Sequence, residues 1–238
     1  VARDVQRFIF PYNRTPTLYN SAVNIEELNK ARAIDGLFFK SISPDIYSGI
    51  ALLSRLDSYL LSTRPFSVNG ASAASNGTAF ASQSSEAEPY LIFLKELSSY
   101  HDHLFGRVRG SVFTEVVEAI MQANKHVFEG KFRVSKMASI LRIVAELSKR
   151  GGRPYKEGMT DLSHIASANK LRLWFNFCRA ICPSNNVLSS IQVIADKKNF
   201  ISFNVSNLGG HDIFEAADIA GKIIGNYVMP ESLEEYSF

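Results

Sequence analysis

The chain has 238 residues, of which 46% are hydrophobic, and its formal net charge is only +3. A chain of this length and composition buries a full core without disulfides or structural metals, which excludes a disordered chain and a small disulfide scaffold. No run of about 18 apolar residues occurs, so no transmembrane helix is expected. One large domain and two small lobes are both compatible with the length.

Residues 1–62 are predicted to hold an extended arm followed by a helical pair. The arm, residues 1–23, shows no clear hydrophobic period. Asn24 is a good N-cap for a helix over residues 25–40, and Glu27 stands at the capping-box position. Pro44 suits the first turn of a second helix, in which apolar residues recur at helical spacing as far as Leu60.

Residues 63–88 are interpreted as a flexible linker or loop. The segment is rich in Ser, Ala, Asn and Gly. Such a segment cannot bury enough apolar surface to offset the entropy lost on ordering. It is therefore the best candidate for a boundary between two lobes. Residues 89–238 would then form the main helical domain, with a basic centre, a C-terminal hairpin and a last helix.

Apolar residues at helical spacing predict four helices in the main domain, over residues 89–105, 111–128, 135–150 and 161–182. Gly130 is expected to end the second of these helices. The helix over 161–182 is the most apolar and is expected at the centre of the core. Its predicted inward-facing residues are Leu171, Trp174, Phe177, Cys178 and Ile181. Cys178 and Cys182 are interpreted as core thiols, because a disulfide within one helical turn has poor geometry.

The hydrophobic period becomes alternating after this helix. Residues 187–195 and 200–205 are predicted to form a β-hairpin around a turn at 196–199. A last helix is expected from Asp212 to about Tyr227, and the acidic tail after Pro230 is expected to fray. The predicted fold class is therefore mainly α, with six to seven helices and a small C-terminal β-hairpin.

Charge is distributed unevenly along the chain. Residues 101–180 hold 14 basic and 7 acidic side chains, whereas residues 181–238 hold 3 basic and 7 acidic ones. A basic surface neutralises nucleic-acid phosphates, Arg forks onto phosphate oxygens, and aromatic rings stack on unpaired bases. Tyr155 is the predicted stacking residue. Phosphate contacts are predicted for Arg107, Arg109, Arg142, Lys149, Arg150, Arg153, Lys156 and Arg172.

Two other interpretations fit the same cations. Lys and Arg near a helix C-terminus complement the helix dipole, and a following Gly is a common cap, so these residues also suit a merely solvated face. An acidic protein partner is the second of these interpretations. The acidic C-terminal part of a neighbouring copy is one such partner, and it would give a head-to-tail homo-oligomer.

No local pattern identifies a reaction, and no metal or cofactor is expected. The His101-Asp102-His103 and His211-Asp212 segments lack the further ligands of a His-Asp metal phosphohydrolase. Gly221-Lys222 lacks the rest of a phosphate-binding loop. An enzyme with scattered catalytic residues stays open as an alternative, with a pocket lined by Trp174 and Phe177.

The sequence thus predicts a non-enzymatic protein that binds single-stranded RNA or another polyanion and self-assembles, in the manner of a nucleoprotein or coat protein. The alternative is a structural or adaptor subunit of a larger protein complex that contains no nucleic acid. Residues 1–7 do not resemble a signal peptide, and the cysteines fit a reducing compartment, so an intracellular, cytoplasmic location is expected.

Overall fold

The computed structural model describes residues 2–6, 12–19, 21–32, 36–62, 103–150, 152–182 and 233–237, with four isolated positions at 215, 218, 219 and 222. Within these ranges the protein is mainly α-helical, with seven α-helices, one 3-10 turn and two short strands. This confirms the predicted mainly α, multi-helix fold class. The linker at 63–88, the helix over 89–105 except its last residues, the hairpin at 187–205 and most of the last helix lie outside the described residues.

The N-terminal part is built around α3, Pro44–Leu52. It also contains α1, Ala2–Gln6, the 3-10 turn η1, Tyr12–Arg14, and α2, Ile25–Lys30. Pro44 occupies the first turn of α3 as predicted, and every residue from Ile46 to Leu52 is buried.

Helix α2 is much shorter than the predicted helix over residues 25–40. Asn24 caps it as expected, accepting a hydrogen bond from the Glu26 amide at 2.8 Å. Glu27 pairs with Lys30 at 2.6 Å. No residue of α2 is fully buried, and only the half-buried Leu28 packs against the apolar core, so little tertiary packing supports a longer helix.

Two strands from distant parts of the chain form a small antiparallel sheet. Strand β1, Ser58–Ser62, pairs with β2, Leu233–Ser237, and Tyr59 lies opposite Tyr236. Two predictions are wrong here: Leu60 belongs to a strand and not to a helix, and the acidic tail is paired and not frayed. Pairing with β1 gives the tail backbone hydrogen bonds that a free end lacks.

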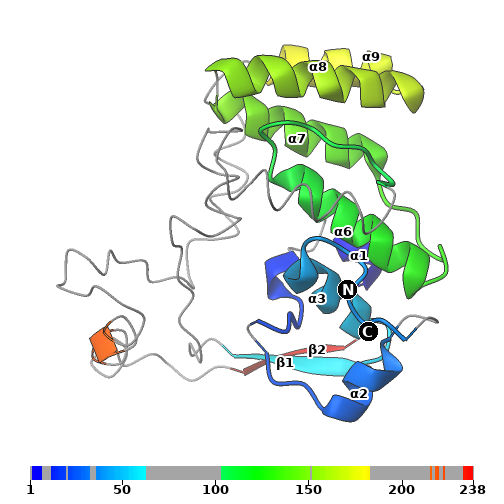
Figure 1. The fold of residues 1–238 in the computed structure, drawn as a ribbon, viewed down its shortest axis with the longest axis vertical. Helices are drawn as coiled ribbons and strands as arrows, with labels where there is room; N and C mark the ends of the chain where they lie inside the picture. The colour runs from blue at the N-terminus through cyan, green and yellow to red at the C-terminus, as the bar shows by residue number, and fades with distance from the viewer. Residues whose placement is uncertain are drawn as a thin grey trace.

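The other described helices stack in layers above α3 (Figure 1). They are α6, Phe113–His126, α7, Lys136–Arg150, α8, Gly152–Ala168, and α9, Arg172–Ile181. Helix α6 is the central layer, because one apolar face packs with α3 and the other with α7. Ile120 belongs to the first apolar cluster and Val117 to the second. The predicted helices over 111–128 and 135–150 are confirmed to within two residues.

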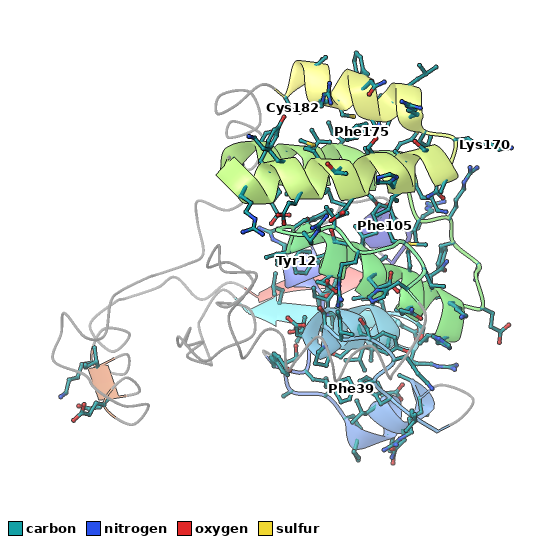
Figure 2. The ribbon with its side chains drawn as sticks, turned by 45° about the horizontal axis from the view of Figure 1, so that its top comes forward. Tyr12, Phe39, Phe105, Lys170, Phe175 and Cys182 are labelled. Carbon is teal, nitrogen blue, oxygen red and sulfur yellow. The ribbon has the colours of Figure 1, made fainter. Side chains whose placement is uncertain are left out.

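The single helix predicted over residues 161–182 is instead two helices. Lys170 adopts a left-handed backbone conformation, with φ +59°, and the Leu171 amide donates to the Ala166 carbonyl at 2.7 Å. This turn reverses the chain between α8 and α9 (Figure 2). Gly152, with φ +62°, begins α8, so Arg153, Tyr155 and Lys156 are helical and do not lie in a turn.

Helix α9 lies at the outer edge of the molecule and not at the centre of the core (Figures 1 and 2). Phe175 and Cys178 are the residues of α9 that are buried. Phe177 is 52% exposed and Ile181 is 43% exposed, which corrects their predicted inward orientation. The reason is that α9 packs against α7 and α8 on one side only. Both cysteines are free thiols, and Cys178 is buried while Cys182 is half-buried.

Candidate nucleic-acid interface

Carboxylates from three helices hold the loop that precedes α6, which contains Arg107 and Arg109. Glu118 of α6 accepts hydrogen bonds from the Leu104 and Phe105 amides at 2.9 and 3.0 Å. Glu146 of α7 accepts hydrogen bonds from the Val112 and Phe113 amides, both at 3.0 Å. It thereby satisfies amides at the start of α6 that have no partner within the helix. These acids are committed to the backbone and do not face an external ligand.

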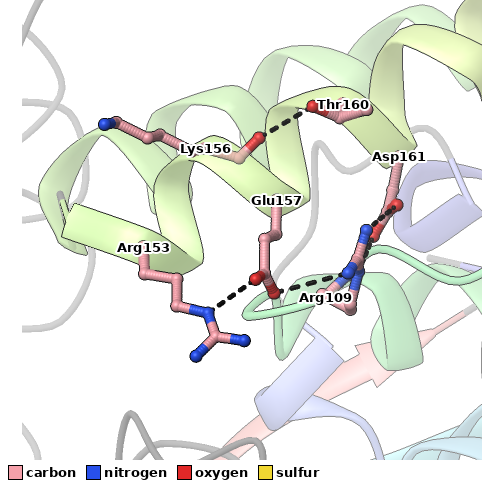
Figure 3. Close-up of polar contacts among 6 residues, drawn as sticks. All are labelled: Arg109, Arg153, Lys156, Glu157, Thr160 and Asp161. Carbon is pink, nitrogen blue, oxygen red and sulfur yellow. Dashed lines mark hydrogen bonds and ion pairs between the residues drawn. The ribbon is translucent and has the colours of Figure 1, made fainter.

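Asp161 of α8 is the third carboxylate, and it binds Arg109 (Figure 3). Its two oxygens accept from Nε and Nη2 of Arg109, each at 2.8 Å, and one also accepts from the Arg109 amide at 3.0 Å. Burial acts to raise the pKa of Asp161, but the hydrogen bonds from Arg109 outweigh it and hold the pKa below its ordinary value. Arg109 is thus anchored to α8, although half of its side chain is exposed.

Glu157 lies between Arg109 and Arg153 on the same face of α8 (Figure 3). Its oxygens are 2.7 Å from Nε of Arg153 and 3.4 Å from Nη1 of Arg109. The hydrogen bond from Arg153 lowers the pKa of Glu157. The Arg153 side chain nevertheless remains 73% exposed.

Arg107 is turned inward and does not form part of the exposed surface. Its Nε and Nη2 atoms are buried and make no hydrogen bond to any described atom. The nearby Glu115 is also buried, and burial raises its pKa to about 7 even though the positive charge of Arg107 acts to lower it. Arg107 therefore serves as a counter-charge within the fold.

The remaining predicted phosphate contacts are spread over α7 and α9. Arg142 lies over the Phe113 ring, 5.8 Å from its centroid, and burial lowers its pKa. Lys149 is exposed near the end of α7, and Arg172 is exposed at the start of α9. Arg150 ends α7, and its side chain lies outside the described residues.

Tyr155 and Lys156 come together in an open pocket between α8 and α9, which we call the α8–α9 pocket. Its volume is about 430 Å³. The buried side chains of Met159 and Phe175 contribute its apolar floor. The described residues that line it are Tyr155, Lys156, Met159, Thr160, Ser163, His164, Phe175 and Arg179. These eight residues supply two cations, an imidazole and three hydroxyls, and none of them is an acid.

Sequence reasoning missed Thr160, Ser163, His164 and Arg179 as site residues. A signal for them exists in the sequence. Lys156, Thr160 and His164 are spaced by four, which places them in one row along a helix. The row can be recognised only if the helix begins at residue 152, and the predicted helix began at residue 161.

Among the described residues of 103–182, most cations are exposed and most acids are not. Eleven Lys and Arg side chains in this range are exposed, whereas Glu129 is the one exposed acid. Glu115 and Glu118 are buried, and the other three acids are half-buried in the contacts given above. The surface of these helices is therefore more positive than the sequence tally indicates.

The His, Cys, Asp and Glu side chains of the described ranges do not gather at a metal site. No cluster of three or more His, Cys, Asp or Glu side chains suited to a metal ion occurs in this part of the chain. His101, Asp102, His211 and Asp212 lie outside it, and His103 is exposed. None of the described helices is both long and apolar enough to span a bilayer. Comparisons with protein-family models, with curated proteins and with solved structures found no match.

Proposed function

We propose that this protein is a non-enzymatic, nucleoprotein-like or coat-like protein that binds single-stranded RNA on its outer helices. The binding residues would be the exposed cations of the basic surface, which we define as Lys149, Arg153, Lys156, Arg172 and Arg179. The observation that carries the proposal is the separation of charge, with eleven cations outward and a single acid outward in residues 103–182. Phosphate neutralisation by such cations supplies most of the affinity for a nucleic-acid backbone.

A single strand suits this surface better than a duplex. Tyr155 is half-buried in the α8–α9 pocket, directly beside Lys156 in sequence. An aromatic ring in a small pocket can contact a base only when the base is unstacked from its neighbours. The ion-paired Arg109 and the inward Arg107 are left out of the proposed contact set, because their guanidinium groups already serve the fold.

The proposal is tested by the binding of a fluorescent single-stranded RNA across a salt series. We expect tight binding at low salt and a steep salt dependence. Replacing Lys149, Lys156 and Arg172 with Ala should reduce the slope of log K against log salt by about 2, since each phosphate contact on a single strand contributes about 0.7. The matched control replaces Lys30, Lys40 and Arg55, which lie on the N-terminal part of the molecule, and removes the same total charge.

The control should leave the salt slope close to that of the wild type. Equal losses in both triple variants would show that binding depends on overall charge and not on the basic surface. No binding at low salt would overturn the proposal.

Self-assembly is the second part of the proposal, and an exposed stripe on α9 supports it. Leu173, Phe177 and Ile181 are spaced by four, and Leu173 is 86% exposed. Trp174 stacks on Phe177 with ring centroids 5.5 Å apart. Contiguous apolar residues at a surface mark an interaction site. The expected location is intracellular and cytoplasmic.

The same stripe favours the alternative function, a structural or adaptor subunit of a larger complex. Light scattering on the wild type and on the Leu173→Ser, Phe177→Ser double variant separates the two. Self-assembly is supported if the wild type has a mass above that of one chain and the variant has a lower mass. A single-chain mass, with a fixed protein partner lost from the purified variant, supports the adaptor.

A further inference from the structure

The α8–α9 pocket differs from the ion-paired face of the same helix. Glu157 and Asp161 lie four residues apart and contact Arg109 of the loop before α6, and Arg153 pairs with Glu157. The Lys156 side chain points away from this group (Figure 3). Among the described residues, no carboxylate forms an ion pair with Lys156 or with Arg179. Helix α8 therefore has an ion-paired face toward the Arg109 loop and a cationic face toward the pocket.

The pocket combines a dry floor with a charged rim. Met159 is 6% exposed and Phe175 is 2% exposed, so the floor is apolar. Lys156, His164 and Arg179 are exposed and line the opening. A ligand that fits this arrangement has an apolar part that enters and an anionic part that stays at the rim. Because the described lining residues include cations and no acid, they favour an anion over a cation or a zwitterion.

The volume limits the size of such a ligand. About 430 Å³ is at the small end of the range for ligand pockets and suits one small molecule or one unit of a polymer. A flat aromatic base is small enough for a pocket of this volume. Inorganic phosphate alone would leave the apolar floor and the Tyr155 ring without a partner.

We propose that the α8–α9 pocket accepts a single nucleotide unit of the bound strand, with the base against Tyr155 and the floor, and the phosphate between Lys156 and Arg179. This inference rests on the proposed function and names the point at which the strand is held. Thr160 donates its hydroxyl proton to the Lys156 carbonyl at 3.0 Å, so its oxygen is left to accept from a base or a ribose.

The test uses the full chain, a fluorescent single-stranded RNA of mixed sequence, and adenosine 5′-monophosphate as a second probe. Tyr155→Leu keeps an apolar side chain but removes the ring, and it should weaken RNA binding about tenfold without changing the salt slope. Tyr155→Phe keeps the ring and should bind like the wild type. Lys156→Ala with Arg179→Ala should reduce the salt slope by about 1.4. Lys125→Ala with Lys131→Ala, at the α6–α7 turn, is the control of equal charge.

The outcomes separate this inference from the proposed function. One outcome is that the wild type binds RNA tightly while Tyr155→Leu and the Lys156→Ala, Arg179→Ala double variant bind it equally well. That result would overturn the role of the pocket but not the proposed function. A wild type that binds no RNA would overturn both. Tight binding of the mononucleotide without RNA binding would assign the pocket to a free nucleotide and would overturn its role on a strand. Should Tyr155→Leu fail to fold, the exposed Lys156 and Arg179 still decide the result.

Discussion

Glu115 places a carboxyl group inside the molecule with little to stabilise its charge. The residue is 6% exposed, and its Oε2 atom has no hydrogen-bond partner among the described atoms. Burial raises its pKa to about 7, assisted by the nearby Glu118 and opposed by Arg107. Because the pKa is raised on folding, the folded protein holds a proton that the unfolded chain releases between pH 4.5 and about 7.

Stability should therefore fall as the pH rises through this window. Below pH 4.5 the carboxyl is protonated in both states, so its ionisation does not lower the free energy of unfolding. Above pH 7 it lowers that free energy by about 3 kcal/mol. We expect Glu115→Gln to gain about 2–3 kcal/mol over the wild type at pH 8, relative to their difference at pH 5. Urea unfolding of both proteins at the two pH values measures this. A difference that does not vary with pH would contradict the account of Glu115.

The contact between α7 and α8 depends on a glycine. A Cβ atom placed on Gly158 would lie 2.5 Å from the Arg109 carbonyl oxygen and 2.8 Å from a Leu147 methyl carbon. The carbonyl belongs to the loop that Asp161 and Glu146 hold, so it cannot easily move. Gly158 therefore permits the close approach that positions both the loop and the pocket-lining face of α8.

Gly158→Ala should destabilise the protein by about 1–3 kcal/mol, even though Ala favours an isolated helix by about 1 kcal/mol. The free energy of unfolding in urea measures the effect. Ser167→Ala is the matched control, since it lies in the same helix at an exposed position and should change stability by less than about 0.5 kcal/mol. A Gly158→Ala variant as stable as the wild type would show that α8 can shift away from the loop.

Elements whose signals are local were predictable from the sequence, and elements set by distant contacts were not. Apolar residues at helical spacing predicted α6 and α7 correctly, and Gly130 follows the end of α6 as expected. The turn between α8 and α9 was missed because Lys170, and not a Gly or Pro, adopts the left-handed conformation. Strand β2 was missed because its partner β1 lies far away in the sequence.

The candidate site shows the same division. Tyr155 and Lys156 were selected from a local cluster of cations, and the structure places both in the pocket. Arg109 was selected as a phosphate contact because its partner Asp161, 52 residues further along the chain, is invisible to local reasoning. Phe175 and Arg179, on the other wall of the pocket, could not be predicted as site residues, because they reach it only through the chain reversal after α8.

At the scale of the whole molecule, the helices form successive layers from α3 through α6 and α7 to α8 and α9 (Figure 1). In residues 103–182 most acids are buried or half-buried, where several of them hold loops and helix ends, while most described cations are exposed. The net charge of +3 conceals this arrangement, because an acid that is buried or committed to the backbone does not offset an exposed lysine in front of an approaching polyanion.

The most direct test of this account is to map where RNA touches the protein. Single-stranded RNA containing 4-thiouridine would be crosslinked to the wild type by light, and the attached peptides would be identified by mass spectrometry. We predict crosslinks within residues 152–182, centred on Tyr155, that are lost when Lys156 and Arg179 are replaced by Ala. Crosslinks that instead fall within residues 21–62, or that persist unchanged in this double variant, would contradict it.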